Sequence, residues 1–234
     1  MFKKTLIATA LLAGSSAALA EISGNVNLAT DYVFRGWSQT DNQLAIQGGL
    51  DYAHDSGFYL GTWASNVDSD FFNLGDGHDP QIELDIYGGF SGELANGVGY
   101  DLGYIRYEYP GYGDADTNEV YLGGSFSNFS AKLVYSDELA FIGSKESAWY
   151  LAGGYEMELP EGFGLSASLG YSFGDAFDND VFSDSYLDWS IGVTKSVGGV
   201  DLGLTYTDVD LDSSDECNSD ICDTKFVFSI GKSL

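Results

Sequence analysis

Several stretches of this sequence alternate charged or polar residues with large apolar ones. The stretch LATDYVFRGWSQT, residues 28–40, carries the opposite charges of Asp31 and Arg35 among aromatic and aliphatic side chains. Successive side chains of a β-strand point to opposite faces, so residues of one parity share a face. Charged groups gathered on one face can bind ions, select between ions of opposite sign, or hold one another in a buried network.

The alternation places a mainly acidic set of residues on the polar side of the expected strands. Asp31 and Arg35 lie about 13 Å apart along an extended chain, at ~3.3 Å per residue, so they cannot pair with each other. We expect Arg35 to have a cross-strand partner, with Glu83 and Asp51 as the candidates. The residues predicted to line the polar side are Asp31, Arg35, Gln47, Asp51, Glu83, Asp85, Tyr87, Asp101 and Lys132.

Two further groups lie near the C-terminus. Cys217 and Cys222 are the only cysteines, and in an exported chain we expect them to form one local disulfide. Asp208, Asp210 and Asp212 are spaced like ligands of a Ca²⁺ loop, although the glycine and the glutamate of an EF-hand are missing from it. A solvated acidic loop is therefore the simpler interpretation, with Ca²⁺ as the alternative, and we expect no other cofactor.

The histidines give little support to an enzyme. The sequence has only His54, in an expected short turn, and His78, in an expected long connection. Neither stands beside a serine on a strand face, so a Ser–His pair is not predicted. We expect no catalytic residues and no enzyme activity.

The charge balance limits the partners. The chain has 36 Asp and Glu residues against 9 Lys and Arg residues. Binding of nucleic acid needs a basic face, so nucleic acid is excluded as a partner. Cations, neutral solutes and divalent metal ions fit the acidic balance.

The first twenty residues have the features of a secretory signal peptide. Lys3 and Lys4 precede the apolar run LIATALLA, and small residues stand at Ala18 and Ala20. The apolar run is too short to span a bilayer as a helix. We expect residues 1–20 to be removed and residues 21–234 to form one domain.

Period-two alternation recurs along the rest of the chain and predicts twelve strands. Their connections alternate between short and long. Between 98 and 109 the apolar parity shifts at Ile105, which predicts a β-bulge. The expected strands lie near 22–34, 43–53, 57–67, 81–91, 98–109, 118–127, 129–136, 147–157, 163–173, 186–196, 200–209 and 224–233.

Two all-β architectures fit this pattern. An even number of strands, alternately short and long connections, and aromatic residues near strand ends are typical of transmembrane β-barrels. A soluble β-sandwich also has one apolar face per strand and is the alternative. We predict a single antiparallel transmembrane β-barrel of about 12 strands, of the type found in bacterial outer membranes.

Six segments in the first half of the chain carry a family resemblance: TDYVFRG (30–36), SQT (38–40), QGGLDY (47–52), GFYLGTWASN (57–66), ELDIYGGF (83–90) and GYIRYEYPG (103–111). These segments resemble a bacterial family of porins labelled TorF-family, also described as conserved hypothetical proteins of the Gcw type. The resemblance is dense over residues 22–125 and implies an outer-membrane barrel without specifying a solute.

The functional prediction is an outer-membrane porin of a Gram-negative bacterium that passes small solutes by diffusion. An acidic interior favours cations and neutral solutes over anions. Two alternatives stay open, a structural barrel with a plugged lumen and a soluble periplasmic β-sandwich that binds a ligand. The expected partners are small solutes and outer-membrane lipid, including lipopolysaccharide.

Overall fold

The computed structural model describes residues 21–68, 80–140, 143–177, 185–211 and 220–234. Residues 1–20, including the expected signal peptide, lie outside the described part of the chain. Within the described part, no helix is long and apolar enough to cross a membrane.

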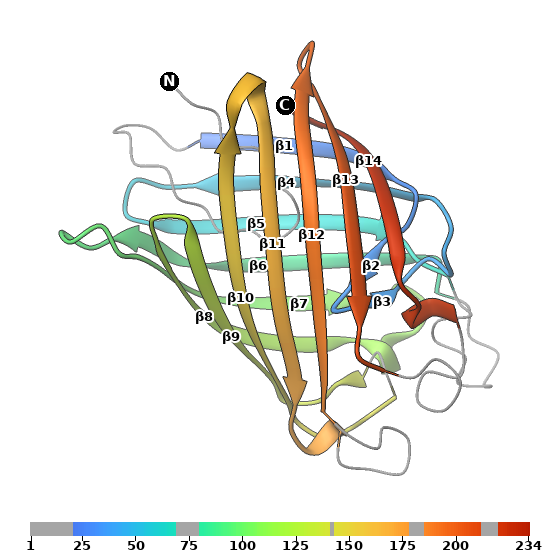
Figure 1. Cartoon of the computed structure of the whole chain (residues 1–234). Helices are drawn as coiled ribbons and strands as arrows, with labels where there is room; N and C mark the ends of the chain where they lie inside the picture. Colours follow the sequence, from blue (N-terminus) through green and yellow to red (C-terminus); the bar gives the residue numbers. More distant parts are fainter. Residues whose placement is uncertain (1–20, 69–79, 141–142, 178–184, 212–219) are drawn as a thin grey trace.

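Twelve antiparallel strands form a closed barrel, in which β1 pairs with both β4 and β14 (Figure 1). This confirms the predicted fold class, and the soluble sandwich is wrong. The strands are β1 (Glu21–Ala29), β4 (Ala45–Ala53), β5 (Phe58–Asn66), β6 (Ile82–Glu93), β7 (Gly99–Glu108), β8 (Thr117–Phe126), β9 (Phe129–Ser136), β10 (Ala148–Leu159), β11 (Phe163–Phe173), β12 (Tyr186–Val197), β13 (Val200–Val209) and β14 (Lys225–Ser233).

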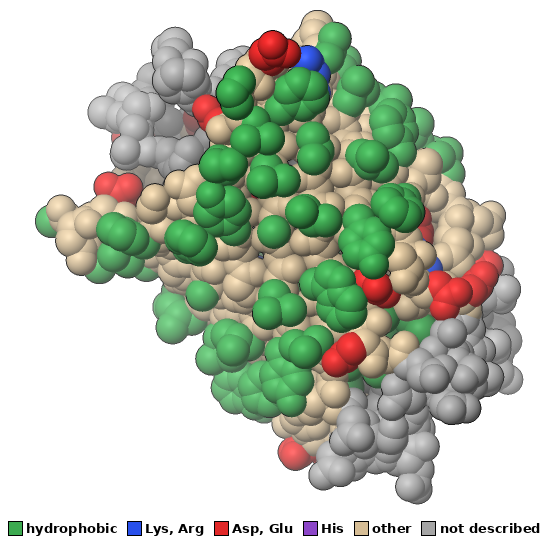
Figure 2. Space-filling model, viewed as in Figure 1, with side chains coloured by type: hydrophobic (Ala, Val, Ile, Leu, Met, Phe, Trp, Pro, Cys, Tyr) green, Lys and Arg blue, Asp and Glu red, His purple; other side chains and the backbone are tan. Residues whose placement is uncertain are grey.

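The outer face of the barrel is apolar. Ile22, Ile46 and Phe226 are 76%, 67% and 70% exposed, while polar residues of the other parity face the interior. Figure 2 shows hydrophobic side chains spread over the strand surface, with acidic side chains towards its edges. A surface of this kind is stable in contact with lipid and unstable in water.

The strands run alternately up and down, so successive connections lie at opposite ends of the barrel, and those at one end are short. The turn between β12 and β13 is formed by Gly198 and Gly199, whose φ angles of 63° and 82° suit a two-residue hairpin. β1 begins and β14 ends at the side of the short turns, and the strand ends that the longer connections join lie at the opposite side (Figure 1). We call these the short-turn end and the long-loop end.

Two details of the expected strands are wrong. β1 ends at Ala29 instead of reaching residue 34, and the chain then forms a short hairpin, β2 (Val33–Phe34) and β3 (Trp37–Ser38). The expected bulge is absent from β7, whose pairing with β6 is continuous from Gly99 to Glu108. Ile105 is apolar and faces inwards because the interior is itself apolar at this end.

Candidate functional site in the barrel interior

The connection between β1 and β4 folds into the barrel instead of projecting from it. Its residues 37–40 are buried, and the Trp37 ring packs against Tyr186 of β12 at 6.2 Å between centroids. A Cβ on Gly36 would lie 2.9 Å from Val209 of β13. Because β12 and β13 are not the neighbours of β4, this inner hairpin, residues 30–44, crosses the interior.

Arg35 lies at the tip of the inner hairpin and forms a buried ion pair. Its Nη2 donates to both carboxylate oxygens of Glu119 on β8 at 2.8 Å, and the two side chains are 10% and 2% exposed. The guanidinium also lies over the rings of Phe34 and Tyr150, at 4.7 and 4.4 Å from their centroids. Burial lowers the pKa of Arg35, but the carboxylate of Glu119 outweighs it and holds that pKa above its ordinary value.

The expected partners of Arg35, Glu83 and Asp51, are therefore wrong. The prediction places Arg35 on a wall strand, whereas Arg35 adopts a φ of 48° in a turn that carries it across the lumen. Glu119 was missed, although it alternates with Val120 in the same way as the predicted residues do. This alternation is the feature of the sequence from which the inward position of Glu119 could be predicted.

Asp31 and Glu83 hold the hairpin in place. Asp31 accepts hydrogen bonds from Ser38 Oγ at 2.6 Å and Thr40 Oγ1 at 2.8 Å, so it fixes the base of the hairpin. Glu83 accepts from Tyr32 OH at 2.7 Å, which joins the hairpin to β6. Tyr109 OH donates to the other oxygen of Glu83 at 2.8 Å.

Most of the remaining interior carboxylates accept a hydrogen bond from a tyrosine. Tyr59 OH donates to Asp101 at 2.6 Å, and Tyr87 OH donates to Asp51 at 2.5 Å. These hydrogen bonds satisfy one oxygen of each carboxylate without forming an ion pair. Asp188 on β12 has the same arrangement with Tyr150 OH, at 3.2 Å.

The tyrosine rings lie against the wall over glycines of neighbouring strands. A Cβ on Gly61 would be 2.4 Å from the ring of Tyr87, and one on Gly103 would be 2.4 Å from the ring of Tyr121. Only glycine leaves room for a ring in this position. The rings therefore lie flat along the wall with one face towards the interior, and they do not project into the interior.

The other predicted polar residues also lie on the inner wall. Gln47 accepts a hydrogen bond from Asn27 Nδ2 at 2.9 Å. Lys132 Nζ lies 3.9 Å from the ring centroid of Tyr121. Asp85 is 6% exposed, and its Oδ1 has no hydrogen-bond partner among the described residues. That these residues line a path for solutes remains a prediction.

Apolar side chains pack together inside the long-loop end. Trp37 of the inner hairpin and Tyr186 of the wall belong to this cluster, as do Ala115, Phe177 and Ile221 from three connections. The cluster narrows the interior at this end, whereas the acidic and tyrosine-lined wall continues towards the short turns.

The candidate ligands and cysteines of the C-terminal connection are only partly described. Asp208 accepts from Tyr206 OH and Thr224 Oγ1, both at 2.9 Å, and Asp210 accepts from the backbone N–H of Leu187 at 2.6 Å. Asp212 and Cys217 lie outside the described residues, so the Ca²⁺ site and the disulfide are untested. Cys222 is buried.

Of the two histidines, only His54 belongs to the described residues. His54 Nδ1 lies 2.9 Å from Ser56 Oγ within an exposed turn between β4 and β5. Because both residues belong to one turn, the contact is a local turn interaction. His78 lies outside the described residues.

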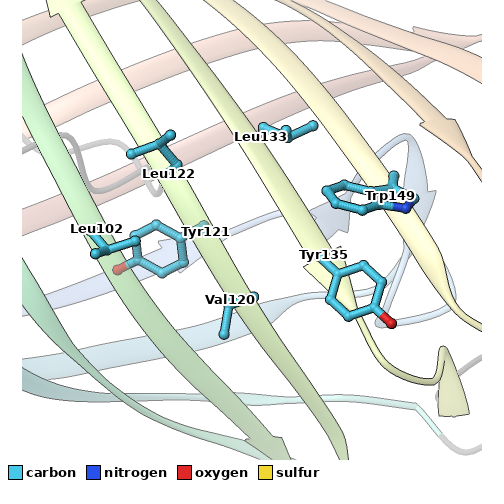
Figure 3. A pocket seen from close by; sticks show the side chains of 7 residues that line it. All are labelled: Leu102, Val120, Tyr121, Leu122, Leu133, Tyr135 and Trp149. Carbon is cyan, nitrogen blue, oxygen red and sulfur yellow. The ribbon is translucent and has the colours of Figure 1, made fainter.

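The outer wall carries a separate shallow groove. It has a volume of about 310 Å³ and is lined by Leu102, Val120, Tyr121, Leu122, Leu133, Tyr135 and Trp149 (Figure 3). Since Leu102 and Leu122 are 57% and 58% exposed on the apolar face, lipid chains would fill this groove.

Solved porin structures share this architecture. The KdgM porin in complex with disordered oligogalacturonate has a TM-score of 0.56 and 10% identity, with 91% of this chain and 98% of that chain covered. The NanC porin has a TM-score of 0.54 and 7% identity, with 90% and 98% covered. At these identities the likeness shows the fold alone.

Sequence comparison gives the family. None of the curated proteins matches the chain. A family model described as bacterial protein of unknown function (Gcw_chp) matches residues 13–234, and the chain belongs to this family.

Proposed function

We propose that the protein is an outer-membrane porin that passes small cations and neutral solutes by diffusion. The observation that carries this proposal is the excess of carboxylates on the inner wall. The described inward-facing carboxylates include Asp51, Glu83, Asp85, Asp101, Glu119 and Asp188, whereas the described inward-facing cations are Arg35, Lys132 and Lys225.

The physical basis is electrostatic. Arg35 forms an ion pair with Glu119, whereas Asp51, Asp101 and Asp188 accept hydrogen bonds from tyrosine hydroxyls. A narrow passage with low-dielectric walls and fixed negative charge concentrates cations and repels anions. Twelve strands enclose more space than eight, which side chains just fill, and less than the sixteen of a general porin.

The ligand of the KdgM structure does not transfer to this chain. Oligogalacturonate carries a carboxylate on every sugar, and an acidic wall would repel it. The resemblance to TorF-family porins, and a location in the outer membrane among lipopolysaccharide, are parts of the same proposal.

Liposome swelling tests the solute preference. The three solutes should be matched in size and differ in charge, for example glucosamine, glucose and gluconate. We expect entry rates of glucosamine and glucose to exceed that of gluconate. Fastest entry of gluconate would refute the preference, and equal rates for all three would show a path without charge selection.

A second function is favoured by the apolar cluster at the long-loop end. Trp37 and its neighbours close over part of the interior, and a structural barrel with a plugged lumen would use such a cluster for stability. This reading predicts no entry of any of the three solutes. It also predicts that entry appears in Arg35→Ala, which releases the hairpin tip.

A further inference from the structure

Asp85 faces inwards from β6 and is 6% exposed, and its Oδ1 has no hydrogen-bond partner among the described residues. Asp31 and Asp188 also have one buried oxygen without a partner, but each accepts a hydrogen bond on its other oxygen. Glu83, two residues earlier on the same face, has two tyrosine partners. A buried carboxylate without a partner is costly, and a cationic ligand is one way to offset that cost.

Aromatic side chains flank Asp85 on both sides. Trp63 on β5 and Tyr107 on β7 are its directly opposite neighbours in the sheet. Side chains in such pairs have Cβ atoms about 5 Å apart, so both rings stand beside the carboxylate. Tyr107 is buried, because its ring packs against Phe34 of the inner hairpin at 5.8 Å between centroids.

The Trp63 ring is the part of this arrangement that solvent can still reach. It is only half-buried, and its ring lies over Gly49 of β4, where a Cβ would be 3.3 Å from Cδ1. Tyr32 packs against it edge to face at 5.2 Å between centroids. Since Trp63 belongs to the inner wall, its exposed surface faces the lumen.

We propose that Asp85 and Trp63 form a binding site for organic cations that carry an amino group. The carboxylate supplies the opposite charge and a hydrogen-bond acceptor, and the indole face attracts the ammonium group through a cation–π contact. The inference rests on the proposed function, because it names the class of solute that such a passage would hold.

Binding of a matched pair of probes to the full-length protein in detergent tests the site. The cationic probe is 1,4-diaminobutane and the neutral probe is 1,4-butanediol, and titration calorimetry at constant ionic strength gives both affinities. We expect the diamine to bind at least tenfold more tightly than the diol. Equal affinities would overturn the proposal.

Substitutions assign the binding to the two residues. Asp85→Asn should weaken diamine binding at least tenfold, and Trp63→Leu should weaken it about fivefold. Glu93→Gln removes one charge from the exposed short-turn end of the same strand and should leave the affinity unchanged. If Asp85→Asn binds like the wild type while its circular dichroism is also unchanged, the proposal is wrong.

Ion conductance of the same preparations separates this inference from the proposed function. Diamine binding that depends on Asp85 in a protein without conductance would support the site and refute the porin. Conductance without any binding of the diamine would support the porin and refute the site.

Discussion

At the scale of single residues, a buried ion pair ties the inner hairpin to β8, a distant part of the chain. Arg35 and Glu119 are separated by 84 positions and are almost completely buried. The alternation places Arg35 and Glu119 on the polar side of extended segments, but it does not show which residues face each other across the lumen. That pairing depends on the closure of the barrel, which no local pattern contains.

The ion pair gives a prediction about stability. Arg35→Ala should lower the free energy of unfolding by about 3–5 kcal/mol, because the buried Glu119 loses its ion-pair partner and keeps only hydrogen bonds from Tyr107 and Ser136. Arg106→Ala is the matched control, since Arg106 pairs with Glu108 and Asp116 at 35% exposure and should cost ~1 kcal/mol or less. Urea unfolding in lipid vesicles measures both losses of free energy. Equal losses would show that the buried pair contributes no more to stability than the exposed one.

The double substitution adds a test of the same contact. Glu119→Gln in the Arg35→Ala background should cost little more than Arg35→Ala alone, because the unpaired charge is removed. Additive losses would mean that the two side chains act independently.

At the scale of elements, all twelve wall strands were predictable, because each alternates an apolar face with a polar one. The first strand was extended too far, since Tyr32 and Phe34 continue the same alternation after Ala29. Period two describes any extended backbone, and it cannot separate a wall strand from a hairpin inside the barrel. Gly36, which adopts a φ of 88° in the turn of the hairpin, is a local sign of the change in the sequence.

The glycines beneath the tyrosine rings give a prediction at this scale. Gly61→Val should lower the free energy of unfolding by about 1–3 kcal/mol, because its Cβ would lie 2.4 Å from the ring of Tyr87. The displaced ring would also lose its hydrogen bond to Asp51 and reduce the conductance. Gly153→Val is the control, because the nearest atom to its Cβ would be 4.0 Å away. Similar effects of the two substitutions would contradict the packing described for Tyr87.

At the scale of the whole molecule, the apolar and polar faces are inverted relative to a soluble protein. Leu122 and Phe126 of β8 are 58% and 60% exposed on the outside, and the carboxylates lie inside. Such a barrel is stable only where lipid covers its outer wall.

This inversion predicts a dependence on depth in the bilayer. Leu122→Arg, in the middle of β8, should cost about 2–4 kcal/mol of folding free energy in vesicles. Phe126→Arg, at the end of the same strand, should cost about 0–1 kcal/mol, because the side chain reaches the interface. Equal costs measured by urea titration would mean that β8 does not cross the bilayer as described.

The reversal potential of the protein in a planar bilayer under a KCl gradient tests the central claim most directly. An acidic and open interior predicts measurable conductance with a potassium-to-chloride permeability ratio above one, and Asp51→Asn combined with Asp101→Asn should move that ratio towards one. A ratio below one, or the absence of conductance from correctly folded protein, would contradict the account.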